Sequence, residues 1–180
     1  GGVINIITEP AKGNNFTAGV RTGSLLNTDI YTSGNISQNK TSLLYFLNRN
    51  SSNGYELNKS SPEKTLEPYF NYTGQLKLAH QFSPKTKLTT NSRLFYGLQQ
   101  SRYAINSSQL NVTGDGSTKD FLINPVLSHR FNNRLQTNLR LMASGYSFTQ
   151  QLDSISNNKQ YYYDRFNQGF YRAENQTDFS

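Results

Sequence analysis

Apolar and polar residues alternate with a period of two along most of the chain. The clearest stretch is 135–145, where odd positions are apolar or small and even positions are mostly polar. Residues 70–82 and 87–98 repeat this pattern, and weaker copies occupy 16–24, 29–37, 42–50 and 121–131. Because strand side chains point alternately to two faces, the pattern predicts strands with one apolar and one polar face. No window has a helical period, so we expect an all-β, antiparallel fold.

The length of the strands and their connections favours a membrane barrel. Several stretches extend over about 11 to 15 residues, against about 5 to 6 in soluble proteins and about 9 to 11 for strands that cross a bilayer. Tight links are expected at 38–41, 83–86 and 132–133, and long loops at 51–68, 100–119 and 151–163. Only the first connection, 26–28, is short where a long loop is expected. Short turns at one end and long loops at the other are typical of outer-membrane barrels.

The composition is dominated by uncharged polar residues, with 34% hydrophobic and 16% charged residues but 12 Tyr and 11 Phe. Disordered chains lack aromatic residues, so this chain is expected to fold. No run approaches the roughly 18 consecutive apolar residues of a membrane-spanning helix. The formal net charge is +7, but the 18 Lys and Arg residues are scattered. We therefore expect no nucleic-acid partner.

No arrangement of residues indicates catalysis or a cofactor. The chain has no Cys, which excludes disulfides and thiol chemistry. It also lacks a nucleophile elbow, a paired-acid motif and a phosphate-binding glycine loop. Residues 111–120 begin like a calcium-binding loop, but Leu122 occupies the position of the bidentate acid. We predict a turn rich in Gly and Asp there, no catalytic residues and no cofactor.

A repeated motif, Leu-small-His-x-Phe, precedes two of the expected tight turns. It contains His80 and Phe82 in one copy and His129 and Phe131 in the other. A metal site built on the two His would need a third ligand that the local sequence does not offer, so no metal is expected. We interpret these four residues as part of an aromatic girdle at a membrane interface.

The densest aromatic cluster is 160–165, which contains Tyr161, Tyr162 and Tyr163. Together with Tyr103 on the neighbouring expected loop, these side chains could stack on a ligand ring or bind a chelate. They could equally form the outer aromatic girdle. Both interpretations remain open from the sequence.

Three segments resemble TonB-dependent outer-membrane receptors. The opening GGVINIIT closely resembles the segment that ends the plug domain of these receptors, and Gly1, Gly2, Asn5 and Thr8 carry the match. Residues 48–55 resemble the strand-to-loop element of the third barrel strand. Residues 171–176 resemble the Arg-x-Glu-x-Gln pattern that is frequent near the eighth barrel strand of these receptors. The order of the expected strands also resembles that of these receptors over essentially the whole chain.

This resemblance implies a 22-stranded barrel, occluded by a plug, in the outer membrane of a Gram-negative bacterium. Residues 1–12 would be the end of the plug and its linker, and 13–180 about the first eight strands of the barrel. The receptor would import a scarce small-molecule ligand, such as a metal chelate of the siderophore-iron, haem or cobalamin class. Its other partners would be outer-membrane lipid or lipopolysaccharide, and the TonB complex through a plug segment outside this chain.

The polar strand faces, which carry Arg21, Lys77, Arg93 and Arg140, would then line the lumen or meet the plug. Two alternatives remain open from the sequence. One is a small outer-membrane or surface barrel of eight strands with a structural or adhesion role, which closes on itself. The other is a soluble β-sandwich that binds carbohydrate through exposed tyrosines and has shorter strands.

Overall fold

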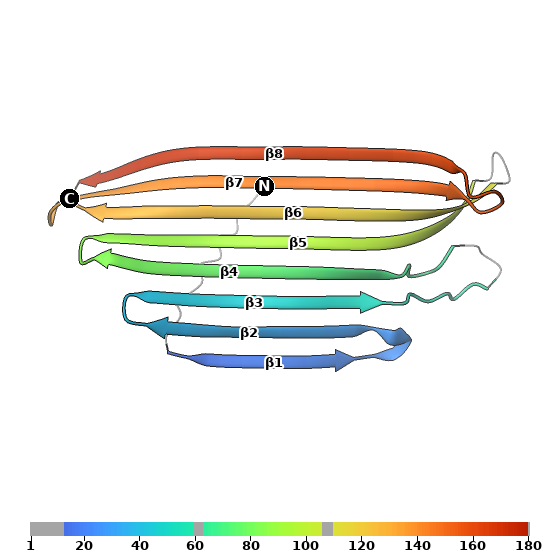
Figure 1. Ribbon diagram of the computed structural model, residues 1–180, viewed down its shortest axis with the longest axis horizontal. Coiled ribbons are helices and arrows are strands. Elements are labelled where there is room, and N and C mark those ends of the chain that lie inside the picture. Colours follow the sequence, from blue (N-terminus) through green and yellow to red (C-terminus); the bar gives the residue numbers. More distant parts are fainter. Residues whose placement is uncertain (1–12, 60–62, 106–109, 180) are drawn as a thin grey trace.

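A computed structural model of the chain, which describes residues 13–59, 63–105 and 110–179, contains a single antiparallel sheet of eight strands (Figure 1). Each strand pairs with its neighbours in sequence, so the sheet is a series of consecutive hairpins. The expected all-β antiparallel fold is confirmed. The strands are β1 (Asn15–Thr22), β2 (Thr28–Gln38), β3 (Thr41–Ser52), β4 (Tyr69–Ser83), β5 (Thr86–Ile105), β6 (Leu110–Arg130), β7 (Leu135–Ser154) and β8 (Gln160–Phe179).

A short 3-10 turn, η1 (Ser24–Leu26), links β1 to β2. The proposed plug end, 1–12, lies outside the described residues and so do Gly1, Gly2, Asn5 and Thr8. No helix in the described part of the chain is both long and apolar enough to cross a membrane.

The sheet is a single layer with two open edges, β1 and β8 (Figure 1). Among the described hydrophobic side chains, only Val112 is fully buried, because no second layer packs on either face. A β-sandwich needs a second sheet, and an eight-stranded closed barrel needs pairing between β1 and β8. The described residues show neither arrangement.

The tight turns lie at one end of the sheet, shown at the left in Figure 1. Two residues, Asn39 and Lys40, separate β2 from β3, and Asn39 adopts the left-handed conformation (φ 52°) that Asn tolerates well. Pro84 and Lys85 separate β4 from β5. The turn before β7 is closed by the Asn132 side chain, which accepts hydrogen bonds from the Arg134 and Leu135 amides at 2.8 and 2.9 Å.

Two of the three predictions of a long loop are wrong, because strands occupy most of the residues concerned. Instead of a loop over 100–119, β5 continues to Ile105 and β6 begins at Leu110, so the predicted turn at 111–120 is strand. A Cβ at position 114 would lie 2.5 Å from the Leu152 side chain. Gly114 therefore leaves room for Leu152 within the strand and does not form a turn. Likewise β7 extends to Ser154 and β8 begins at Gln160. Of the three expected long loops, only the one between β3 and β4 is present as predicted.

The register assigns every strand residue to one of two faces. Directly paired residues share a face, and the pairing runs unbroken from Val20 and Ile30 through the sheet to Ser147 and Asn167. We call the face that carries Val20 the apolar face. It holds the even-numbered residues of β1, β2, β4 and β5 and the odd-numbered residues of β3, β6, β7 and β8. The opposite face is the polar face.

Candidate functional site

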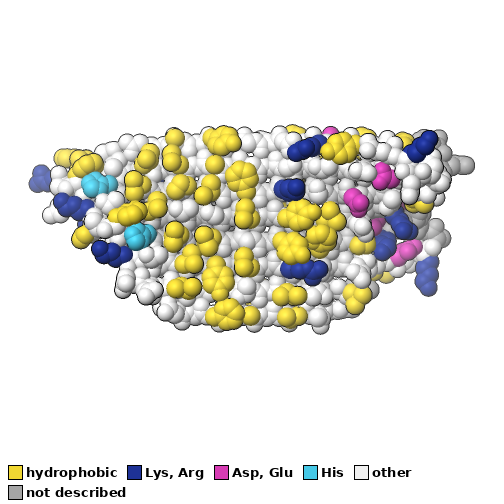
Figure 2. All heavy atoms as spheres, viewed as in Figure 1, with side chains coloured by type: hydrophobic (Ala, Val, Ile, Leu, Met, Phe, Trp, Pro, Cys, Tyr) yellow, Lys and Arg dark blue, Asp and Glu magenta, His cyan; other side chains and the backbone are white. Residues whose placement is uncertain are grey.

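A broad apolar band crosses all eight strands on the apolar face (Figure 2). Large hydrophobic side chains in it are 41 to 65% exposed, although the band lies in the middle of the sheet. Such a large exposed apolar surface marks an interaction site, because soluble monomers rarely expose one of this size. Representative residues of the band are Val20, Leu47, Leu76, Leu94, Ile123 and Leu141.

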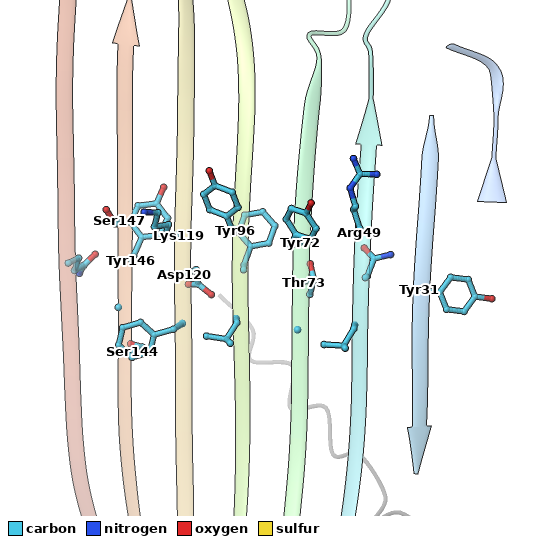
Figure 3. Close-up of a pocket in the computed structure, with 18 of the residues that line it drawn as sticks. Tyr31, Arg49, Tyr72, Thr73, Tyr96, Lys119, Asp120, Ser144, Tyr146 and Ser147 are labelled. Atoms are coloured by element: carbon cyan, nitrogen blue, oxygen red, sulfur yellow. The ribbon is translucent and has the colours of Figure 1, made fainter. Parts of the chain in front are cut away.

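Toward the long-loop end, the band is bounded by a row of cationic and tyrosine side chains. Arg49, Tyr72, Tyr96 and Lys119 are successive register partners on β3, β4, β5 and β6. Figure 3 shows them side by side at the same level. The Arg49 guanidinium and the Lys119 ammonium each lie 5.9 Å from the ring centre of a neighbouring tyrosine. We call these four residues the long-loop row.

A groove of about 1130 Å³ crosses the sheet at this level and is lined by residues of all eight strands (Figure 3). Its lining includes the long-loop row and the next row on the same face. That second row is rich in small residues, among them Ala18, Gly74, Gly145 and Gly169. Larger side chains, those of Leu47, Leu94 and Phe121, alternate with them in this row, and the lining also includes polar-face residues such as Tyr31, Thr73 and Asp120.

At the opposite boundary, His80 and Phe82 lie at the end of β4. The Thr41 hydroxyl and His80 Nδ1 are 2.8 Å apart, within hydrogen-bonding distance. The His80 and Phe82 rings are in edge contact, with centres 4.7 Å apart. The Gln81 amide donates to the Lys40 carbonyl at 2.8 Å, which fixes this strand end against the preceding turn.

The same arrangement recurs at the end of β6. His129 Nδ1 lies 2.9 Å from the Thr86 hydroxyl, and its ring centre is 4.6 Å from that of Phe131. The Arg130 amide donates to the Lys85 carbonyl at 2.8 Å, as Gln81 does to Lys40. We call each set of Thr, His and Phe a Thr-His-Phe module. The four predicted girdle residues are therefore grouped in two equivalent pairs at one boundary of the apolar band.

The separation of the two boundaries can be compared with the lipid-facing band of a membrane barrel. Lys119 and His129 are ten residues apart on β6, which corresponds to about 34 Å along a strand. With the tilt of about 40° that is typical of membrane barrels, that length would span about 26 Å of height, against roughly 25 Å for the lipid-facing band of a barrel.

The polar face carries the ion pairs. Arg21, Lys77, Arg93 and Arg140 all belong to it by register, as the alternation predicts. Arg21 pairs with Asp29 at 3.5 Å, and Arg93 pairs with Asp120 at 3.8 Å. The third ion pair, between Arg172 and Glu174 at 3.1 Å, is also on this face. Among the described residues, all three of these ion pairs thus lie on the face opposite the apolar band.

The predicted tyrosine cluster does not form one platform. Tyr161, Tyr162 and Tyr163 are about half exposed at the start of β8. Tyr162 pairs with Leu152 and Tyr163 with Gln151, so these neighbouring rings project to opposite faces. Tyr103 belongs to β5, and its side chain lies outside the described part. In residues 13–59, 63–105 and 110–179, no three His, Asp or Glu side chains gather as a metal site would require.

Sequence reasoning missed the long-loop row and the two threonine partners of the histidines. Each of these groups joins residues from different strands, and only the register brings them together. The repeated Lys-Thr dipeptide at 40–41 and 85–86 was the available signal for the threonines. Comparison with protein-family models, curated proteins and solved structures finds no match to this chain.

Proposed function

We propose that the chain forms part of the wall of an outer-membrane β-barrel, with the apolar face toward lipid and the polar face toward the lumen. The observation that carries this proposal is the apolar band, which lies between two aromatic boundaries at a bilayer's spacing. Because hydrocarbon tolerates no unpaired strand edge, this proposal requires that further strands pair with β1 and β8 to complete the barrel.

Within this proposal, the barrel belongs to a TonB-dependent receptor. Support comes from the opening segment, from 48–55 at the end of the third strand and from 171–176 in the eighth. Residues 1–12 end the plug, and the ion-paired polar face surrounds it. The receptor imports a metal chelate of the siderophore-iron, haem or cobalamin class with energy from the TonB complex, and it has no enzymatic activity.

Single-tryptophan scanning tests the orientation of the sheet. Residues 1–180 contain no Trp, so an introduced Trp reports from a known position once any Trp elsewhere in the protein is replaced. In vesicles whose acyl chains carry bromine, Leu94→Trp and Ile123→Trp on the apolar face should be strongly quenched. The adjacent controls, Phe95→Trp and Leu122→Trp, lie on the polar face and should not be. Equal quenching at all four positions would contradict the proposal.

Uptake by intact cells tests the transport function. Cells that express the protein should accumulate a ferric chelate, haem or cobalamin, and deletion of TonB should abolish that accumulation. Accumulation of one ligand without dependence on TonB would contradict the receptor assignment while leaving the barrel assignment intact.

A further inference from the structure

The three tight turns and the strand residues beside them carry only positive formal charge, and Asp178, the β8 partner of Gln136 at this end of the sheet, projects to the polar face. We define the tight-turn edge as residues 36–43, 78–90 and 126–138. This edge contains no Asp or Glu. Its cations are Lys40, Lys85 and Arg134 in the turns, and Lys87 and Arg130, which the register assigns to the polar face.

At the long-loop end, carboxylates and cations are mixed. Figure 2 shows this difference: Lys, Arg and His gather at the left end without acidic groups, whereas both signs occur at the right. The cations of the tight-turn edge therefore have no partners of opposite charge within it.

Each histidine at this edge has one nitrogen committed to the protein. In both modules Nδ1 lies against a threonine hydroxyl, at 2.8 Å for His80 and 2.9 Å for His129. Nε2 is then the ring nitrogen that remains for a ligand. The Lys85 ammonium donates to the Phe131 carbonyl at 3.3 Å, which places it beside the second module with further N–H groups to donate.

The arrangement is repeated, and strand pairing alone does not require the repetition. The two modules lie on β4 and β6, about 10 Å apart across the sheet because one strand separates them. In each module the threonine is the second residue of a Lys-Thr dipeptide, at 40–41 and at 85–86. The rest of the two hairpins differ in sequence. In both modules the Phe ring is about half exposed.

We propose that the tight-turn edge binds the phosphate of anionic phospholipid headgroups in the adjacent leaflet. Lysine ammonium groups and histidine N–H groups would donate to the phosphate oxygens, and Phe82 and Phe131 would lie among the acyl chains. A lipid phosphate is favoured over free phosphate because the donors directly border the apolar band. This inference rests on the proposed membrane orientation and adds a lipid preference to it.

The test measures the association of spin-labelled phosphatidylglycerol and phosphatidylcholine with the full-length protein in vesicles. The wild type should immobilise about five times as much spin-labelled phosphatidylglycerol as phosphatidylcholine. A factor of this size is about the effect of one cation near an anionic surface. The double variant Lys40→Gln/Lys85→Gln should bring the ratio close to 1, and Lys40→Arg/Lys85→Arg should retain it. The control Lys64→Gln/Lys159→Gln, at the long-loop end, should leave it unchanged. Salt at 1 M should lower the ratio, because the Debye length falls to about 3 Å.

The outcomes separate this inference from the proposed function. A wild-type ratio near 1 in protein that inserts normally, or a high ratio retained by Lys40→Gln/Lys85→Gln, would overturn the headgroup site and leave the barrel assignment intact. Failure of the wild type to insert in any vesicle would overturn both. Saturable binding of inorganic phosphate by the detergent-solubilised protein, lost in the double variant, would overturn the lipid assignment in favour of a free-phosphate site.

Discussion

Phe121 and Gly145 are direct partners across β6 and β7, and the Phe121 ring occupies the space in which a Cβ at position 145 would lie. The same relationship joins Gly19 to Tyr31, whose ring is 2.5 Å from an added Cβ, and Gly34 to Tyr45, at 2.9 Å. In each pair an aromatic ring covers the glycine opposite it, an arrangement that pins strand register. These glycines are packing positions within strands rather than turns.

Gly145→Ala should therefore destabilise the protein. The new methyl group overlaps the Phe121 ring, and overpacking of this kind lowers the free energy of unfolding by about 1–3 kcal/mol. Gly116→Ala is the matched control, because its Cβ would meet only the Gln99 carbonyl at 3.7 Å. That change should be neutral or stabilising by about 0.5–1 kcal/mol. Urea titration of the full-length protein in micelles measures both, and equal effects at the two sites would contradict this packing role.

Period-two alternation was sufficient to predict the fold class and the two faces, but not the contacts between strands. It placed Leu94 and Arg93 on opposite faces because that assignment depends on one strand alone. The start of β6 was missed because Gly114 was interpreted as a turn residue, whereas it accommodates Leu152 from β7. A cross-strand partner cannot be read from alternation within one segment. For the same reason, the alignment of Tyr72 with Tyr96 became visible only with the register.

An arginine placed in the apolar band should impair insertion far more than one on the polar face. Leu94 is 63% exposed in the middle of the band, and a cation near the bilayer midplane costs about 2–4 kcal/mol. Thr73→Arg is the control, since Thr73 adjoins Gly74, the partner of Leu94, but projects to the polar face. The folded fraction in vesicles should fall for Leu94→Arg and change little for Thr73→Arg. The reverse order would show that the faces are inverted.

The hydrogen bond between Thr41 and His80 should be measurable as a coupling energy. Thr41→Val and His80→Phe each remove it, and a double-mutant cycle should give about 0.5–1.5 kcal/mol of coupling in unfolding free energy. The corresponding cycle for Thr86 and His129 should give a similar value. A cycle that crosses the modules, with Thr41 and His129, is the control and should show no coupling. Coupling of zero within both modules would contradict their equivalence.

Residues 1–180 on their own should not form a monodisperse closed barrel. Within the described residues, β1 and β8 each present a row of backbone N–H and C=O groups without a strand partner, and β8 is exposed over nearly its whole length. In detergent such edges promote pairing between chains, and in hydrocarbon they are not tolerated. Size-exclusion chromatography with light scattering should therefore show oligomers or a broad distribution. The chain should also lack the shift in gel mobility on heating that folded barrels show, and the complete receptor that we propose would be the positive control. A monodisperse, heat-modifiable species of 180 residues would instead establish that β1 and β8 can close on each other.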